Sequence, residues 1–265
     1  MRWIYILALF PAGILAGLVN SVAGLASLVS YPALLAVGIP PVYANVTNTA
    51  ALIFSAVGAG TASRHELRGH KRELFKLLPL TVCGGICGGL LLLAAPATSF
   101  EHIVPFFILG AAVLILRPQM LHFNAQPTVQ SGESRRSFFR KHATKILIFA
   151  AIFLVGAYTG YFGAAAGVVM LAMLAATSHL KFAEYNALKN VSLGASNLVA
   201  TILFAFRAHI YWLAVAPLAA GFFIGGSIGP HIVRRVPAKQ LRIIIAIGAI
   251  GLAVYLFIQT YWLKN

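Results

Sequence analysis

The chain has 265 residues, of which 60% are hydrophobic and 9% are charged, and its mean hydropathy is +0.88. Because a soluble domain is about half apolar and about one quarter charged, this composition excludes a soluble domain, a disordered chain and a disulfide-stapled secreted module. It predicts an all-α polytopic membrane protein. The formal net charge is +15. In so apolar a chain, this excess is typical of cytoplasmic loops near anionic lipid and suits an anionic cargo; no nucleic-acid partner is expected.

Apolar segments alternate with short polar stretches along the whole chain, and two of these segments are unusually long. At 1.5 Å per residue, about 35 residues make a rod of roughly 50 Å, too long for one crossing of a hydrocarbon core about 30 Å thick and too short for two. Both long segments contain glycine clusters, so each is predicted to be a broken helix or a hairpin. The expected segments are 3–38, 42–63, 74–95, 102–116, 146–178, 191–206, 210–232 and 243–262.

The two halves of the chain repeat each other in residues as well as in hydropathy. GILAGLVNSVAG (13–24) matches GAYTGYFGAAAG (156–167), with glycines at positions one, five and twelve of both stretches. YANVTN (43–48) likewise matches YNALKN (185–190). Duplication on this scale is the usual plan of secondary transporters. It predicts a first transmembrane repeat over 1–116, a basic cytoplasmic linker over 117–145 and a second repeat over 146–265.

A third repeated motif is rich in glycine, CGGICGG (83–89) in the first half and GFFIGGSIG (221–229) in the second. Overlapping G-x-x-x-G patterns of this kind allow two helix backbones to approach closely. Both stretches are therefore predicted to be helix-packing faces.

Loop charges predict the orientation of the repeats. The basic loops 64–73 and 233–242 and the basic linker belong in the cytoplasm, whereas 96–101 and 207–209 contain fewer Lys and Arg residues. Segment 146–178 must then cross the membrane an even number of times. The halves are therefore predicted to be inverted-topology repeats whose first segments are hairpins, with both termini outside.

Polar residues inside apolar surroundings are the candidates for a substrate site, because polar groups in hydrocarbon either join helices or line a path. Asn20 and Ser21 fall in the broken middle of the first hairpin, where backbone amides at a half-helix N-terminus could hold an anion. Lys189 is a cation entering an apolar helix. The predicted substrate-binding residues are Asn20, Ser21, Asn45, Thr47, Asn48, Asn186, Lys189, Asn190, Ser192 and Asn197.

Each of these residues also has a structural interpretation. Asn20 could hydrogen-bond a neighbouring helix at a glycine crossing, and Thr47 and Asn48 could be helix caps. Lys189 could extend along the bilayer to a lipid phosphate. Glu184 could pair with Lys181 or Lys189, and a loop salt bridge is favoured over a role in proton coupling.

Sequence signatures of catalysis are missing. HELRGH (65–70) spaces its histidines one residue too far apart for the H-E-x-x-H motif of zinc proteases, and there is no Walker A motif and no pair of carboxylates. We therefore expect no enzyme, no metal and no cofactor. A non-transporting membrane assembly subunit and an anion channel are the alternatives to a transporter.

The chain resembles the TauE/SafE sulfite exporter family of bacterial membrane transporters. The matching residues are GLVNSVAG and YPALLAVGIPPVYANVTNTAAL within 17–52, CGGICGG, then GYFGAAAGVVMLAML and NALKNVSLGASNLVATILFAF within 160–206, and GFFIGGSIGPHIVRRVPAKQLR (221–242). One departure is that Leu25-Ala26-Ser27 follows Gly24, where members of the family usually carry a longer glycine run.

The resemblance implies a secondary transporter that exports sulfite, sulfoacetate or other organosulfonates across the bacterial inner membrane. The expected mechanism is alternating access between the two repeats, and the expected partners are a small anionic substrate and membrane lipid. Assembly into a homo-oligomer is left open.

Overall fold

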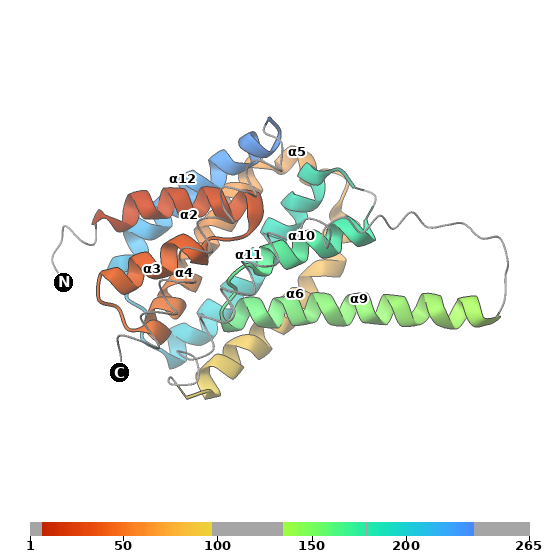
Figure 1. Ribbon diagram of the computed structural model, residues 1–265, viewed down its shortest axis with the longest axis horizontal. Coiled ribbons are helices and arrows are strands. Elements are labelled where there is room, and N and C mark those ends of the chain that lie inside the picture. Colours follow the sequence, from red (N-terminus) through yellow and green to blue (C-terminus); the bar gives the residue numbers. More distant parts are fainter. Residues whose placement is uncertain (1–6, 97–134, 179, 236–265) are drawn as a thin grey trace, which may run out of the picture.

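The computed structural model describes residues 7–96, 135–178 and 180–235, with the side chains of 135–145 excepted. These residues form helices and connecting turns, with no strand among them (Figure 1). Predicted segments 102–116 and 243–262, linker residues 117–134 and both termini lie outside the described residues. The helices are α2 (Leu9–Ala23), α3 (Ser27–Ala36), α4 (Pro41–Ala62), α5 (Arg64–Leu67), α6 (Lys71–Ala94), α9 (Arg135–Tyr161), α10 (Ala166–Thr177), α11 (Phe182–Arg207) and α12 (Trp212–Val233).

Four of these helices, α4, α6, α11 and α12, are long and apolar enough to cross a membrane. Their 22 to 26 residues correspond to about 33–39 Å, which exceeds the hydrocarbon thickness of about 30 Å. The prediction of an all-α, multi-pass membrane protein is therefore confirmed. Helix α11 begins nine residues before its predicted segment, because hydropathy places the polar stretch around Lys189 outside the helix.

Both long segments are broken, as predicted. Helix α2 ends before Gly24, whose φ of 76° is left-handed, and α3 starts three residues later. Helix α9 ends before Gly163 (φ 71°) and Ala165 (φ 60°), and α10 follows. Helices α2, α3 and α10 have 15, 10 and 12 residues. At about 22, 15 and 18 Å, none of them spans a bilayer alone.

The two broken segments form hairpins that point toward each other. Helix α3 folds back beside α2, and α10 folds back beside α9 (Figure 1). Helix α9 begins at Arg135, inside the predicted linker, and its apolar part starts at Ile146. Hairpins that approach from opposite ends are the arrangement that inverted repeats would give, and the inverted repeat stays a prediction.

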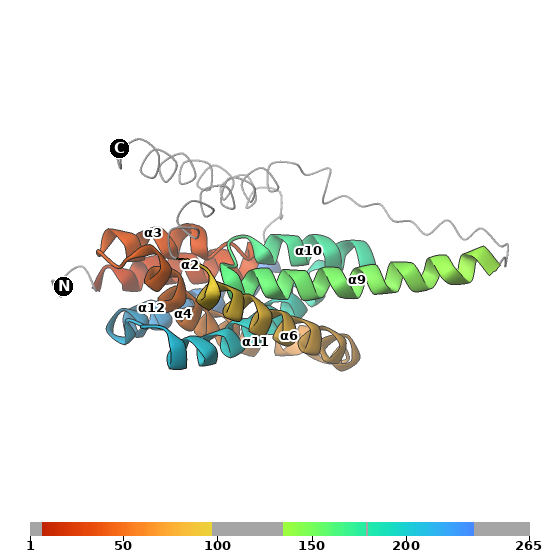
Figure 2. The ribbon, with the colours of Figure 1, turned by 90° about the horizontal axis from the view of Figure 1, so that it is seen from below.

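The helices of one half pack on those of the other. Helix α12 packs on α2 and α4, while α6 packs on α9 and α11, and α4 packs on α11 (Figure 2). When α2, α3, α4 and α6 are equated with α9, α10, α11 and α12, this set of contacts maps onto itself. The two halves are thus interlocked rather than stacked as separate domains.

Glycine faces make these contacts close, which confirms the predicted helix-packing motifs. A Cβ atom on Gly84 or Gly88 of α6 would overlap backbone carbonyls of α9, at Phe153 and Ala157. In the other half, Gly221 and Gly225 of α12 abut backbone carbonyls of α2 in the same way. Backbones this close leave no room for any side chain.

Gly88 and Gly89 are neighbours that test this packing. Gly88→Ala forces a methyl group into the Ala157 carbonyl, whereas the nearest atom to a Cβ on Gly89 is the flexible end of Leu203, at 3.3 Å. We expect Gly88→Ala to destabilise the protein by about 1–3 kcal/mol and Gly89→Ala to change stability by less than about 1 kcal/mol. Thermal unfolding of the detergent-solubilised variants measures the difference, and equal melting temperatures would contradict the close packing of α6 on α9.

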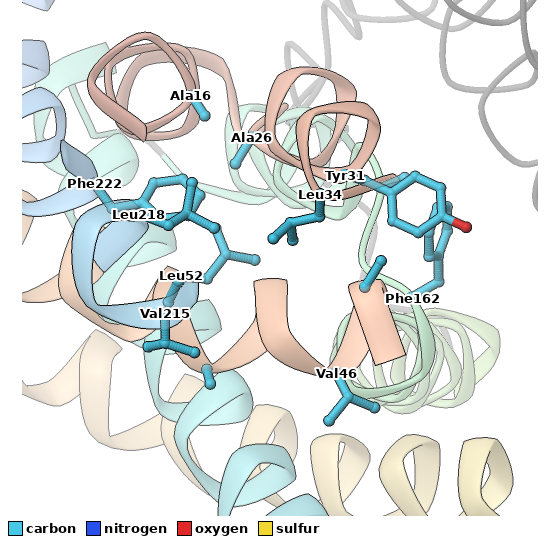
Figure 3. Packing of buried hydrophobic residues seen from close by; sticks show 14 of the residues in the cluster. Ala16, Ala26, Tyr31, Leu34, Val46, Leu52, Phe162, Val215, Leu218 and Phe222 are labelled. Carbon is cyan, nitrogen blue, oxygen red and sulfur yellow. The ribbon is translucent and has the colours of Figure 1, made fainter. Parts of the chain in front are cut away.

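The apolar core surrounds the α2–α3 hairpin. Leu34 of α3 and Phe222 of α12 are fully buried in one cluster with Leu218 (Figure 3). Tyr31 meets Phe162 edge to face, with ring centroids 5.5 Å apart. This contact joins the hairpin of the first half to the turn of the second, and it fixes α3 beside the end of α9.

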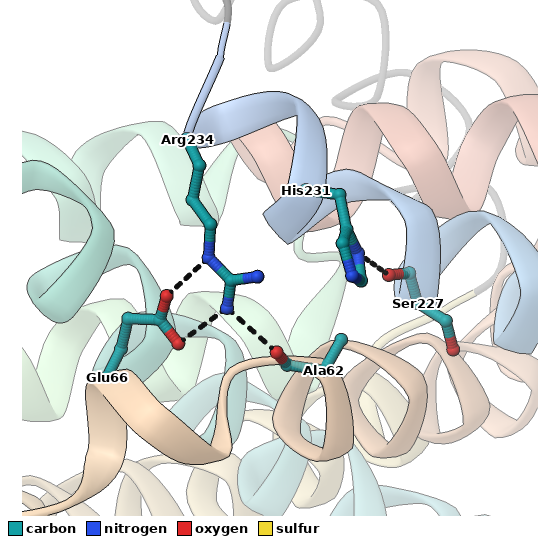
Figure 4. A network of polar contacts seen from close by, with 5 residues as sticks. All are labelled: Ala62, Glu66, Ser227, His231 and Arg234. Carbon is teal, nitrogen blue, oxygen red and sulfur yellow. Dashed lines mark hydrogen bonds and ion pairs between the residues drawn. The ribbon is translucent and has the colours of Figure 1, made fainter.

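One end of the molecule carries the basic loops. Arg234, just after α12, forms a bidentate ion pair with Glu66 of α5, with Nε–Oε1 at 2.6 Å and Nη2–Oε2 at 2.9 Å (Figure 4). The same guanidinium donates to the Ala62 carbonyl at 3.0 Å. Loop 64–73 and residues 233–235, the described part of the predicted loop 233–242, therefore lie at the same end. The assignment of this end to the cytoplasm stays a prediction.

This ion pair gives stability a defined pH dependence. The Arg234 guanidinium holds the pKa of the Glu66 carboxyl below its usual value of 4.5. The pair therefore stabilises the fold above pH 4.5, and that contribution is lost as the pH falls through the lowered pKa. We expect Glu66→Gln to lower the free energy of unfolding at pH 7 by less than about 1 kcal/mol, because Arg234 is partly exposed, and this deficit to shrink as the pH falls through the lowered pKa. A deficit that persists at low pH would contradict this account.

Candidate functional site

The tips of the two hairpins touch at a pair of glycines. A Cβ on Gly24, at the end of α2, would overlap the Cα of Gly167 in the first turn of α10, and the reverse also holds. Beside this contact lies a small cavity of about 30 Å³ that water-sized molecules can reach, enough for one or two of them. It is lined by Asn20, Gly24, Ala26, Ser27, Leu52, Ala56, Thr159, Gly163, Ala166, Gly167, Lys189, Asn190, Leu193, Gly194 and Asn197.

Lys189 is the dominant polar group of the cavity. Its side chain is only 1% exposed, and its Nζ donates to the Asn20 carbonyl at 3.0 Å. No carboxylate of the described residues lies within ion-pair distance of it. Lys189 is seven residues from the start of α11, about 10 Å along the helix, and it points inward. The alternative in which this lysine reaches for a lipid phosphate is therefore wrong.

Side chains of α11 also hold the end of α2. The Ser21 carbonyl accepts hydrogen bonds from Asn186 Nδ2 at 2.9 Å and Asn190 Nδ2 at 3.0 Å. The Asn20 carbonyl accepts the Gly24 amide at 2.7 Å as well as Lys189. The last carbonyls of a helix lack partners within it, so α11 satisfies groups that the break leaves open.

The expectation for Asn20 and Ser21 needs a correction. These residues lie in the last turn of α2, before the break, so the backbone groups that they present are carbonyls rather than freed amides. The freed amides belong to the helices that start after each break. Ala26 and Ser27 at the start of α3, and Gly167 in the first turn of α10, line the cavity; Ala166 lines it too, but its amide donates to the Gly163 carbonyl at 3.1 Å.

A side chain of α4 hydrogen-bonds the end of α9 in the second hairpin, as side chains of α11 hydrogen-bond the end of α2 in the first. Asn45 Nδ2 donates at 2.8 Å to the carbonyl of Tyr161, the last residue of α9. Asn48 Nδ2 donates at 3.2 Å to the Ser27 hydroxyl, which lines the cavity. Thr47 lies on another side of α4, where its hydroxyl accepts the Tyr211 amide at 3.2 Å. The helix-cap interpretation of Thr47 and Asn48 is wrong, since both lie inside α4 and are buried.

The predicted site residues thus fall into three groups. Asn20, Lys189, Asn190 and Asn197 line the cavity, and Ser21, Asn45, Asn48 and Asn186 hold the hairpin ends around it. Thr47 and Ser192 bond elsewhere, Ser192 to the carbonyl of Lys189 on its own helix at 3.2 Å. The structure gives the positions of these residues, and their role in substrate binding stays a prediction.

Two polar residues of the cavity were missed from the sequence. Thr159 of α9 is buried in the wall and bonds the Val155 carbonyl at 2.7 Å, and Ser27 opens α3. A lone hydroxyl in an apolar segment was the available signal for Thr159. Glu184 is not part of the site, because it accepts the Lys181 backbone amide at 2.8 Å and lies 4.0 Å from His70 Nε2.

The arrangement suits an anion. Two helix N-termini, one buried ammonium and the amide of Asn197 converge on one small space. Asn197 is 6% exposed and lines this cavity. The buried ammonium attracts a negative ligand, and the helix N-termini offer unpaired amides as hydrogen-bond donors to it.

Comparisons with known proteins agree with the membrane architecture. The chain is 28% identical to a probable membrane transporter protein, ORF9, of Sinorhizobium sp., covering 94% of this chain and 90% of the relative. It is 25% identical to a probable membrane transporter protein of Haemophilus influenzae, covering 90% and 89%. The probable membrane transporter protein YfcA of Escherichia coli K12 is 26% identical, covering 90% and 84%. No solved structure matches the chain.

The family model of the sulfite exporter TauE/SafE matches residues 9–256, which include both hairpins and the cavity between them. The relatives are named as membrane transporters rather than enzymes, in agreement with the prediction. With its spanning helices and its two broken ones, the chain belongs to the TauE/SafE family and is a multi-pass membrane transporter.

Proposed function

We propose that the protein exports small sulfur-containing anions, sulfite or organosulfonates, across the bacterial inner membrane. The observation that carries the proposal is the cavity between the hairpin tips, where Lys189 is buried beside two helix N-termini with no counter-charge among the described residues. An oxyanion there would accept hydrogen bonds from the ammonium and the amides and would neutralise the buried charge. The family description supplies the sulfur chemistry.

Alternating access would then depend on movement of the two hairpins. The Gly24–Gly167 contact closes the cavity between the tips, and the polar side chains of α11 and α4 hold the two hairpin ends. Release of one set of bonds at a time would open the cavity toward one side only. The two access states would then differ in which bond is broken: the bond from Asn45 to the end of the second hairpin, or the bond from Asn186 to the end of the first.

Anion flux in proteoliposomes tests the proposal. The wild-type protein is expected to move labelled sulfite or a small organosulfonate, and Lys189→Ala is expected to reduce this flux to the background of protein-free vesicles. Asn48→Ala removes one hydrogen bond to the cavity-lining Ser27, worth about 1 kcal/mol, and should slow flux up to about tenfold. Lys181→Ala, an exposed lysine at the start of the same helix, is the matched control and should transport normally.

Wild-type protein that moves none of these anions would refute the proposed substrates. If instead Lys189→Ala and Asn48→Ala both transport like the wild type, the site assignment is wrong while transport itself stands.

A further inference from the structure

The electrostatic balance of the cavity depends on a single side chain. Among the described residues that line it, Lys189 is the only ionisable one. The carboxylates that the structure describes at the ends of α5 and α11, Glu66 and Glu184, bond Arg234 and the Lys181 amide instead. The side chains of the cavity therefore contribute one positive charge.

The helix ends around the cavity cancel one another. Each hairpin presents one C-terminus, of α2 or α9, and one N-terminus, of α3 or α10, at its tip. A helix terminus is equivalent to about half an elementary charge, negative at the C-terminus and positive at the N-terminus. Two negative and two positive ends sum to about zero, so the net charge of the site is that of Lys189 alone.

We infer that the site selects its anion by charge and takes a singly charged oxyanion, such as a sulfonate or hydrogen sulfite, in preference to a dianion of the same shape. This inference rests on the proposed function and narrows its substrate class. A monoanion beside Lys189 leaves a neutral cavity. A dianion leaves one uncompensated negative charge in a small space beside packed glycines, and burying an unpaired charge is costly.

Methanesulfonate and sulfate form a matched pair of probes, because both are tetrahedral and a methyl group replaces one oxygen in the first. Counterflow of labelled methanesulfonate is measured in proteoliposomes that contain the full-length protein, with either unlabelled anion as competitor. Methanesulfonate is expected to compete at least about tenfold better than sulfate, since an unpaired buried charge costs more than the 1.4 kcal/mol that a factor of ten represents. Equal or better competition by sulfate would overturn the inference and leave the proposed transport of anions intact. Absence of methanesulfonate counterflow would overturn the inference, and only the absence of sulfite flux as well would overturn the proposed function.

A second positive charge tests the cause of the preference. Asn197 lines the same cavity, so Asn197→Lys should shift the ratio of the two competition constants toward sulfate by about tenfold or more. Lys181→Ala should leave the ratio unchanged. If Asn197→Lys transports but keeps the wild-type ratio, the charge explanation is wrong; if this variant does not fold, the wild-type ratio still decides.

Discussion

Alanine at Gly24 is expected to abolish transport and to destabilise the protein more than alanine at any other glycine of the hairpin turns. Two effects combine at this position. Its φ of 76° is left-handed, which costs an alanine about 1 kcal/mol or more, and its Cβ would overlap the Cα of Gly167. Overlap with a backbone adds about 1–3 kcal/mol, because neither tip can move away without opening the cavity.

The chain offers a control for each effect. Gly38 has a φ of 86° and nothing within 4 Å of its Cβ position, so Gly38→Ala measures the backbone strain alone. Gly167→Ala measures the overlap, since Gly167 has an ordinary φ. Thermal unfolding should rank the losses as Gly24→Ala, then Gly167→Ala, then Gly38→Ala, with transport retained only in the last. Full transport by Gly167→Ala would contradict the contact between the tips.

Methionine at Lys189 is expected to stop transport while raising the melting temperature. The ammonium is buried without a counter-charge, and replacing buried charge by an apolar group of similar length stabilises proteins by about 1–4 kcal/mol in favourable cases. Methionine is unbranched and flexible, so it can follow the path of the lysine stem. The Asn20 carbonyl keeps the Gly24 amide as a partner, and no acceptor is left without a bond.

Flux assays and thermal unfolding of the same purified protein measure both effects, with Lys181→Met as the control. A lower melting temperature for Lys189→Met would mean that Lys189 holds the end of α2 for structural reasons. Undiminished transport would mean that the substrate does not meet this ammonium.

The breaks in the two long segments could be predicted because they follow from length and composition. An apolar stretch of about 35 residues with clustered glycines cannot be one bilayer-spanning rod. Lys189 could be singled out because a charged residue in apolar surroundings needs a reason to be there. Both arguments use only local sequence, which is why they hold in the structure.

The chemistry of the break could not be read in the same way. Whether Asn20 lies before or after the turn decides whether the backbone offers carbonyls or amides, and a difference of one helical turn separates the two cases. The partner of Asn45 is the Tyr161 carbonyl in the other half of the chain. Contacts of this kind depend on which helices pack together, and neither hydropathy nor motif spacing predicts that pairing.

The start of α11 was also hard to predict, because hydropathy alone misplaces it. Hydropathy excludes Asn186, Lys189 and Asn190 from the spanning segment, yet all three are helical and buried. Polar residues are tolerated there because the end of α2 supplies their partners. A hydropathy profile alone therefore leaves out three of the residues predicted to bind the substrate.

The interlocked packing of the halves has a consequence for biosynthesis. Helix α2 leaves the ribosome well before α12, yet the glycine face that covers α2 belongs to α12. Helix α2 therefore stays unpacked, at the translocon or in lipid, until α12 has been inserted. A chain truncated before α12 would leave this face of α2 uncovered, so we expect such a chain to be degraded faster than the full-length protein.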